Sequence, residues 1–428
     1  IYRRNGLGGI LMFAHLKKKD PVVYELTQRE LQRQRGTLAL IASENYAPLE
    51  VLEASASVLT NKYSEGYPGR RYYAGNEIID EVETLAIERA KKLFGMGYAN
   101  VQPHSGSSAN FAAYRALMKE GDVFMGLRLD QGGHLTHGSP VNFSGQLYKA
   151  ESYSVDRETE TLDYDAIMRQ AMEVKPKVIV CGYTAYPRTV HFDRFREIAD
   201  ACGAFLLCDI SHIAGLIAGG AHMPVGPYAD VVTTTTHKTL RGPRGAIILA
   251  NREEHAKLID KGVFPGSQGG PLDHVTAAKA VCFHNAMQPD FREYAHQIVK
   301  NAKALAEEIQ SLGFRLVSGG TDNHLILIDV KSKGTGLNGK IAQDALEKAG
   351  IICNKNTIPY DSEKPFVGSG IRLGTPAVTT RGMKEPEMRE IARLFGKALE
   401  NHFSDEMLAK IRGEVRSLLD AFPLYPEL

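Results

Sequence analysis

Short apolar runs alternate with helical patterns along the first two thirds of the chain. Runs rich in valine, isoleucine and leucine predict strands at residues 177–184, 204–210, 229–236 and 245–250, and a helical pattern at residues 195–203 separates the first two. Strands that are buried on both faces read as continuous apolar runs, and helices join neighbouring strands when these are parallel. The pattern therefore predicts an α/β fold with a mostly parallel central sheet.

The clearest helical pattern runs from residue 76 to residue 95. Apolar side chains recur at helical spacing from Ile79 to Phe94, with Asn76 as the expected N-cap and Gly95 as the stop. Acidic residues crowd the first turn and basic residues the last, as the helix dipole favours. We therefore expect a regular helix between the two caps.

Past Met287 the pattern changes to that of an α+β domain. A long helical pattern at 290–313 precedes strand candidates at 314–318 and 324–330, and amphipathic helical patterns at 386–403 and 405–422 close the chain. The expected division is an extension or expression remnant over 1–11, with the native chain starting near Met12, then an N-terminal arm over 12–60, a large domain over 61–288 and a smaller domain over 289–428.

The charges of the chain nearly balance, with 51 basic and 50 acidic residues among 428. The sequence thus gives no electrostatic reason to expect nucleic acid or an anionic membrane as a partner. Its most apolar stretch, residues 204–223, is interrupted by Asp209, His212 and His222, which argues against a spanning helix. The five cysteines are odd in number and form no C-x-x-C pair, which favours the reducing cytoplasm and argues against a metal site.

Asp209 and Lys238 follow two of the predicted strands. Because ligands of parallel sheets bind beyond the carboxyl ends of the strands, we expect both side chains at one edge of the sheet. A carboxylate that ends an apolar strand needs a positive or hydrogen-bonding partner, although Asp209 could equally be a helix N-cap. Lys238 could form a Schiff base, because burial and the basic residues around it disfavour its ammonium form; a solvated loop lysine is the alternative.

Two further groups could bind anions. Ser105, Gly106 and Ser107 stand where a strand-like segment passes into a helix, and such a helix start offers N–H groups to a phosphate. Helix capping alone is the alternative, and neither a Walker loop nor a G-x-G-x-x-G motif occurs. Arg372 lies in a short predicted strand flanked by glycines, and its planar guanidinium suits a carboxylate, with a structural salt bridge as the alternative.

These groups together form the set that a pyridoxal phosphate enzyme needs. Lys238 could hold the cofactor, Asp209 could pair with its ring nitrogen, the helix start could cradle its phosphate and Arg372 could bind the carboxylate of an amino acid. Each group has an ordinary structural explanation, but their joint occurrence in this order is not easily accidental.

From Met12 onward the chain resembles the serine hydroxymethyltransferase family over essentially its whole length. The strings that carry the resemblance are IASENY, NKYSEGYPGRRYYAGNE, VQPHSGSSAN, GGHLTHG, TTTTHKTLRGPRG, FPGSQGGP and SGIRLGTPA. The resemblance implies a bacterial-type, fold-type I enzyme, similar in fold to aspartate aminotransferase and dependent on pyridoxal phosphate. It implies reversible transfer of the hydroxymethyl carbon of serine to tetrahydrofolate, giving glycine and 5,10-methylenetetrahydrofolate.

The resemblance also assigns expected roles to single residues. For the cofactor it implies covalent attachment to Lys238, pairing of the ring nitrogen with Asp209, stacking on His134, proximity of Thr184 and His212 to the phenolic oxygen, and phosphate binding by Gly106 and Ser107, joined by Tyr63 and Gly270 from the other subunit of a homodimer. For the amino acid it implies a carboxylate clamp of Arg372 and Ser43, a specificity role for His237, a proton shuttle at Glu65 and a substrate contact at Tyr73. For folate it implies contacts at Leu129, Gly133, His134, Leu135, Asn356, Lys364, Pro365 and Phe366.

Some positions depart from the strings typical of the family. Ile210-Ser211 stands where Met-Ala is usual, Ser108 where glutamine is common and Thr184 where serine is frequent, and Asp130-Gln131 precedes the folate motif. The hydroxyl at position 184 is retained, so the expected chemistry is unchanged, whereas folate affinity and polyglutamate preference are left open. Two other functions also stay open: a folate-independent aldolase acting on threonine or related β-hydroxy amino acids, and a non-catalytic subunit that binds the cofactor.

Overall fold

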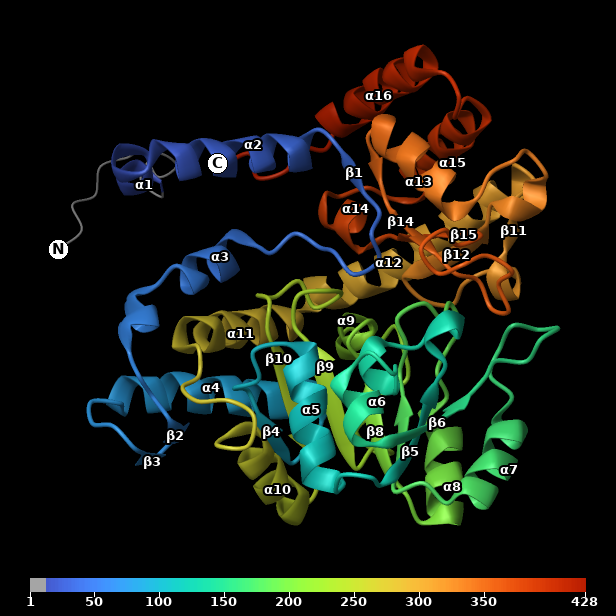
Figure 1. Ribbon diagram of the computed structural model, residues 1–428. Helices are drawn as coiled ribbons and strands as arrows, with labels where there is room; N and C mark the ends of the chain where they lie inside the picture. The colour runs from blue at the N-terminus through green and yellow to red at the C-terminus, as the bar shows by residue number, and fades with distance from the viewer. Residues whose placement is uncertain (1–12) are drawn as a thin grey trace.

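The computed structural model describes residues 13–428, which form a large α/β body and a smaller α+β body (Figure 1). The extension expected over residues 1–11 and the expected start at Met12 lie outside the described residues. Among the described residues, none of the helices combines the length and apolar character needed to cross a lipid bilayer.

A seven-stranded sheet forms the centre of the large body. Its strands lie in the order β4 (Tyr98–Asn100), β10 (Ala246–Ala250), β9 (Val231–Thr235), β8 (Phe205–Asp209), β7 (Val178–Cys181), β5 (Val123–Leu127) and β6 (Lys149–Tyr153). The pairs from β9 to β6 are parallel, whereas β10 runs antiparallel to both β9 and β4. The prediction of a mostly parallel α/β sheet is therefore confirmed.

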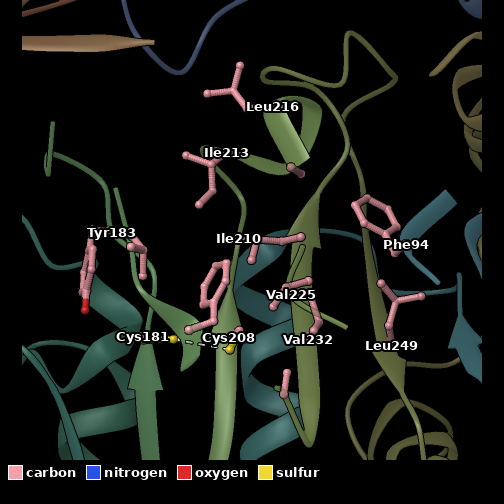
Figure 2. Packing of buried hydrophobic residues seen from close by; sticks show 14 of the residues in the cluster. Phe94, Cys181, Tyr183, Cys208, Ile210, Ile213, Leu216, Val225, Val232 and Leu249 are labelled. Atoms are coloured by element: carbon pink, nitrogen blue, oxygen red, sulfur yellow. Dashed lines mark hydrogen bonds between the residues drawn. The ribbon is translucent and has the colours of Figure 1, made fainter. Parts of the chain in front are cut away.

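Side chains of the strands alternate between two apolar cores, one on each face of the sheet. On one face, Cys181, Cys208, Val232 and Leu249 pack among apolar side chains, and Cys181 Sγ lies 3.3 Å from Cys208 Sγ (Figure 2). The opposite face has a separate cluster that includes Leu207. The first core is covered by α4 (Glu77–Phe94), α7 (Tyr164–Val174), α8 (Phe192–Cys202) and α11 (Asp273–Ala286), and the second by α5 (Gly106–Leu117) and α10 (Glu253–Val263).

Helix α4 matches the predicted pattern, with one correction at its start. Gly95 ends the helix in the left-handed conformation, at φ 64°, as a glycine stop allows. The side chain of Asn76 precedes the helix but caps none of its N–H groups; its Nδ2 donates to Tyr73 O at 2.8 Å instead. Acidic Glu77 and Asp80 occupy the first turn and stabilise it through the helix dipole.

The smaller body is built on a four-stranded antiparallel sheet with its own apolar core. The strands lie in the order β11 (Arg315–Leu316), β12 (Leu325–Asp329), β15 (Gly370–Gly374) and β14 (Asn354–Asn356), and the helices are α13 (Gly339–Lys348), α14 (Pro376–Thr380), α15 (Glu385–Glu400) and α16 (Asp405–Asp420). Helix α12 (Pro289–Ser311) joins the bodies, because Phe291 packs in the large core and Ile309 in the small one. The division at residue 289 stays a prediction.

The N-terminal arm contacts both bodies. Strand β1 (Leu38–Ala39) pairs in parallel with β13 (Ile351–Ile352), and Leu38 is buried in the core of the small body. Helix α2 (Pro21–Arg35) buries none of its side chains and projects from the rest of the chain (Figure 1). The remaining elements are α1 (Ala14–Lys19), α2 (Pro21–Arg35), α3 (Leu49–Ser55), β2 (Gly66–Tyr67), β3 (Arg70–Arg71), α6 (Phe143–Leu147), α9 (Ala214–Ala218), and the 3-10 turns η1 (Val58–Asn61), η2 (Leu129–Gln131), η3 (Leu135–His137), η4 (Val317–Gly319) and η5 (Lys331–Lys333).

Candidate active site

A cavity of about 380 Å³ opens beyond the carboxyl ends of β7, β8 and β9. This is the place where ligands of open parallel sheets bind. The residues predicted from the sequence that line it are Ser43, Ser105, Gly106, Ser107, His134, Thr184, Asp209, His212, His237, Lys238 and Arg372. The cavity is also bordered by residues that the sequence pattern did not indicate: His137, Tyr183, Ser211, Thr235 and Arg244.

Lys238 follows β9 and faces the cavity. Its Nζ donates to Thr235 Oγ1 at 2.7 Å, and the side chain is partly buried, which is not the solvated loop lysine of the alternative interpretation. Burial, with a smaller contribution from the positive charges of Arg244 and Arg372, lowers the pKa of Lys238 to about 8, although Asp209 opposes the fall. An amine with a pKa near neutrality is a competent nucleophile toward a carbonyl group.

Asp209 ends β8, on the neighbouring strand. Its Oδ2 accepts hydrogen bonds from Asn110 Nδ2 at 2.9 Å and His137 Nε2 at 3.1 Å, and its Oδ1 accepts from the hydroxyl of Ser211 at 2.6 Å. Burial raises the pKa of Asp209, but the bond from His137 and the neighbouring groups outweigh it and hold the pKa well below its usual range. The carboxylate therefore stays ionised and can stabilise a positively charged N–H group of a ligand.

His134 lies close to this carboxylate. Burial, followed by the nearby His137, lowers the pKa of His134 to about 4, so its ring is neutral at pH 7. The ligand atoms of His134, His137 and Asp209 lie within 4.8 Å of one another, a spacing that a metal ion could use. The absence of a metal site stays a prediction.

The start of α5 is capped by its own serine side chains and borders the cavity. Ser105 and Ser108 cap each other, because Ser105 Oγ accepts from Ser108 N at 3.3 Å and Ser108 Oγ accepts from Ser105 N at 2.9 Å. The N–H groups of Gly106 and Ser107 lack intrahelical partners, as at every helix start, and their residues border the cavity. A Cβ atom at Gly106 would lie 2.8 Å from Thr235 Cγ2, so a glycine is needed at this close approach.

Arg372 enters the cavity from β15 of the small body. Its Nη1 donates to Thr184 O at 2.8 Å and its Nε to Asn354 Oδ1 at 3.1 Å. Burial lowers the pKa of Arg372 to about 10, which leaves the guanidinium charged at neutral pH. Among residues 13–428 no carboxylate forms an ion pair with it, so the structural salt bridge is not observed. A buried, unneutralised guanidinium suits a carboxylate ligand.

His237 precedes Lys238 and borders the same cavity. Burial, followed by the positive charges of Lys238 and Arg244, lowers the pKa of His237 to about 3. Its Nδ1 is buried and finds no hydrogen-bond partner in the described part of the chain. The ring is therefore neutral, and it keeps a nitrogen that could form a hydrogen bond with a ligand.

A second group of predicted residues lies outside this cavity. Tyr63 Oη donates to Glu65 Oε1 at 3.3 Å, and the rings of Tyr63 and Tyr73 meet edge to face with centroids 5.1 Å apart. A Cβ atom at Gly270 would lie 3.5 Å from the ring of Tyr63. Within one chain these four residues therefore cluster with one another and not with Lys238.

Arg71 holds the backbone on both sides of Glu65. Its Nη1 donates to Ser64 O at 2.9 Å and Gly66 O at 3.0 Å, and its Nη2 donates to Glu83 at 2.6 Å. This arginine lies in the string NKYSEGYPGRRYYAGNE, but its residue type alone did not indicate the role. The backbone around Glu65, the residue predicted to transfer a proton, is thus held in place by the buried ion pair of Arg71 and Glu83.

Replacing Arg71 by methionine is expected to lower the free energy of unfolding by about 3–5 kcal/mol, because Glu83 would keep a buried charge with no cation beside it. The matched control is Arg33→Met, which removes an exposed ion pair with Glu30 and should cost less than about 1 kcal/mol. Urea unfolding of both variants measures the difference. Equal losses would contradict a stabilising role for the buried pair.

The predicted folate residues come from both bodies. Gly133 packs so closely that a Cβ atom there would lie 2.1 Å from Leu127 O, and it leads into His134 at the cavity. Leu129, Leu135 and Phe366 are exposed apolar side chains. Thr357, next to Asn356, donates to Asp130 O at 3.3 Å, and Lys364 Nζ lies 6.0 Å from the ring centroid of Phe366. The role predicted for Pro365 stays a prediction.

Comparison with known protein families identifies the family of this chain. The family model described as Serine hydroxymethyltransferase matches residues 16–395, which include the central sheet and every residue lining the cavity. Enzymes of this family have the fold-type I architecture, depend on pyridoxal phosphate and use tetrahydrofolate as co-substrate. The chain therefore belongs to the serine hydroxymethyltransferase family and is a pyridoxal phosphate-dependent enzyme.

Proposed function

We propose that the enzyme transfers the hydroxymethyl carbon of serine reversibly to tetrahydrofolate, giving glycine and 5,10-methylenetetrahydrofolate. The observation that carries the proposal is the meeting of Lys238, Asp209 and Arg372 at one cavity. These groups supply a nucleophilic amine, a fixed negative charge and a carboxylate clamp, which together fit an amino acid bound beside a pyridoxal phosphate.

The residues of the cavity fit the cofactor. Gly106 and Ser107 would hold its phosphate at the start of α5, where the close approach of Thr235 leaves no room for a side chain at 106. Lys238 would hold it covalently, Asp209 would pair with its ring nitrogen and His134 would lie against its ring. When bound, pyridoxal phosphate acts as an electron sink that accepts the electron pair left on the amino acid.

The side chains of this chain bind and orient the amino acid. Arg372, with Ser43, would grip the carboxylate through a planar fork of donors, which fixes the orientation of the Cα substituents better than a single ammonium group. Lys238 would take up or return a proton through its Nζ, since its pKa lies near neutrality. His237 would contact the substrate beside it.

We also propose that Tyr63, Glu65, Tyr73 and Gly270 serve the active site of a second copy in a homodimer. Two observations support this: the group lies outside the cavity of its own chain, and both tyrosines are about half exposed. A hollow of about 500 Å³ adjoins the cavity and shares Ser43, Glu44, His237 and Arg244 with it. Through this hollow Glu65 of the partner subunit would reach the serine hydroxyl and move its proton.

The deciding experiment is cleavage of serine by the purified enzyme with and without tetrahydrofolate. We expect tetrahydrofolate to speed cleavage by orders of magnitude, because Leu129, Leu135 and Asn356 would hold it beside the cavity. Equal rates would favour the folate-independent aldolase, and threonine cleavage measured in parallel would identify it. Failure to turn over either amino acid would favour a non-catalytic subunit.

Arg372→Lys is expected to lower kcat/KM for serine by roughly a hundredfold, because an ammonium group keeps the charge but loses the second donor and its bond to Thr184 O. Steady-state kinetics with serine as the variable substrate measure the effect. Arg315→Lys is the control, since Arg315 pairs with Glu160 and Asp329 away from the cavity. Equal kinetics in wild type and Arg372→Lys would refute the clamp.

A further inference from the structure

A second histidine contacts His212 without lining the cavity. Nε2 of His324 lies 3.2 Å from Nδ1 of His212, and the two ring centroids are 5.4 Å apart at an interplanar angle of 32°. His324 precedes β12 of the small body and is fully buried, whereas His212 follows β8 and borders the cavity. The contact therefore joins the cavity wall to the other body of the protein.

Both imidazole rings are neutral. Burial, followed by the nearby positive charges of Arg372 and Lys238, lowers the pKa of His324 to about 3. Burial and the same cations hold the pKa of His212 well below its usual range. A neutral imidazole has one N–H donor and one acceptor nitrogen, so the bond between the rings has only two possible arrangements.

The other nitrogen of His324 distinguishes these arrangements. Its Nδ1 is buried and has no hydrogen-bond partner in the described part of the chain. If His212 donated from Nδ1, the proton of His324 would sit on this nitrogen as an orphaned buried N–H group, which folded proteins strongly avoid. If His324 donates from Nε2, its Nδ1 keeps only a bare lone pair.

We propose that His324 is a positioning residue that fixes the proton of His212 on Nε2. His324 then donates from Nε2, Nδ1 of His212 accepts, and Nε2 of His212 is an N–H donor with no partner among residues 13–428. Because His212 borders the cavity, this donor is available to an acceptor bound there. An anionic oxygen is the preferred acceptor, since charge-assisted hydrogen bonds are the stronger ones.

The inference deepens the proposed function and rests on it for the identity of the acceptor. The expected neighbour of His212 is the phenolic oxygen of the cofactor, which an N–H donor stabilises in its anionic form. The opposite tautomer would present a lone pair to the same oxygen and repel it. His324 would thus control a ligand that it does not touch.

Neutron diffraction from crystals of the deuterium-exchanged holoenzyme locates these protons directly. We expect deuterium on Nε2 of both histidines and none on Nδ1 of either. Deuterium on Nδ1 of His324 or of His212 would overturn the proposal. The proton positions are read without turnover. The tautomer proposal can therefore be wrong while the transfer reaction is observed, and it can be right while no transfer is observed.

Variants at His324 test the consequence for cofactor binding. His324→Leu removes the donor and should raise the dissociation constant of pyridoxal phosphate about fivefold, whereas His324→Gln places an amide N–H near the former Nε2 and should stay within about twofold of wild type. His255→Leu is the matched control, because His255 is equally buried but packs against Phe205 away from the cavity.

The ¹⁵N shifts of His212 provide a second signature in the same variants. We expect the pattern of an Nε2-protonated ring in wild type and His324→Gln, and a mixture of tautomers in His324→Leu. If His324→Gln behaves like His324→Leu in both affinity and shifts, the proposal is wrong. If the leucine variant does not fold, wild type, the glutamine variant and the neutron map still decide.

Discussion

Lys238→Arg is expected to lower the rate of serine cleavage by roughly a thousandfold or more. The substitution retains a positive charge and a long side chain beside Thr235, so the chain should fold normally. A guanidinium does not lose its proton in proteins, and it therefore cannot provide the free amine that holds the cofactor covalently. Single-turnover cleavage of serine, and the visible absorption of the protein after addition of pyridoxal phosphate, measure the two consequences.

Lys261→Arg is the matched control for this substitution. Lys261 is an exposed lysine near the end of α10 and does not border the cavity, so its replacement should change neither rate nor absorption. A Lys238→Arg variant with a rate of the wild-type order would remove the amine from the mechanism. Everything proposed for the cavity would then need another nucleophile.

Asp209→Asn is expected to lower the same rate by roughly a thousandfold, because it removes the fixed negative charge that a preorganised site aims at its ligand. In wild type, Asn110 and His137 donate hydrogen bonds to the carboxylate. The amide N–H₂ of the asparagine is itself a donor, so it cannot accept both of these bonds. A second effect follows at Lys238: Asp209 raises the pKa of that amine, so the variant should have a Lys238 pKa below about 8.

The two effects of Asp209→Asn can be measured separately. The pH dependence of cofactor incorporation into the cofactor-free protein reports the lysine, since incorporation requires its neutral form and should begin at lower pH in the variant. Asp230→Asn is the control, because Asp230 precedes β9 at the opposite end of that strand and pairs with Arg196. An unchanged rate in Asp209→Asn would exclude the proposed pairing with the ring nitrogen.

The sequence was sufficient to predict the mostly parallel sheet and the presence of Asp209 and Lys238 at one edge of it. Continuous apolar runs indicated buried parallel strands, and the places where Asp209 and Lys238 follow two of them indicated a shared edge of the sheet. The strand predicted at 229–236 is observed over the shorter range Val231–Thr235. Asn76 was predicted as a cap from its residue type, but its side chain bonds backward to Tyr73.

The partners of the site residues could not be predicted from the pattern. Asn110 and His137 reach Asp209 from segments far away in sequence, and only the packed structure brings them within hydrogen-bond distance. The same holds for His324 behind His212. The group around Glu65 was expected in a shared site through the family resemblance, whereas the geometry of one chain leaves it apart from Lys238.

Arg372 reaches across the boundary between the two bodies, since it lies on β15 and donates to Thr184 O beyond β7. The side chain proposed to grip the substrate is therefore also a link between domains. Any slight rotation of one domain against the other moves this guanidinium relative to Lys238. Loosening of the domain contact, whether by heat or by a distant substitution, should weaken serine binding before either domain begins to melt.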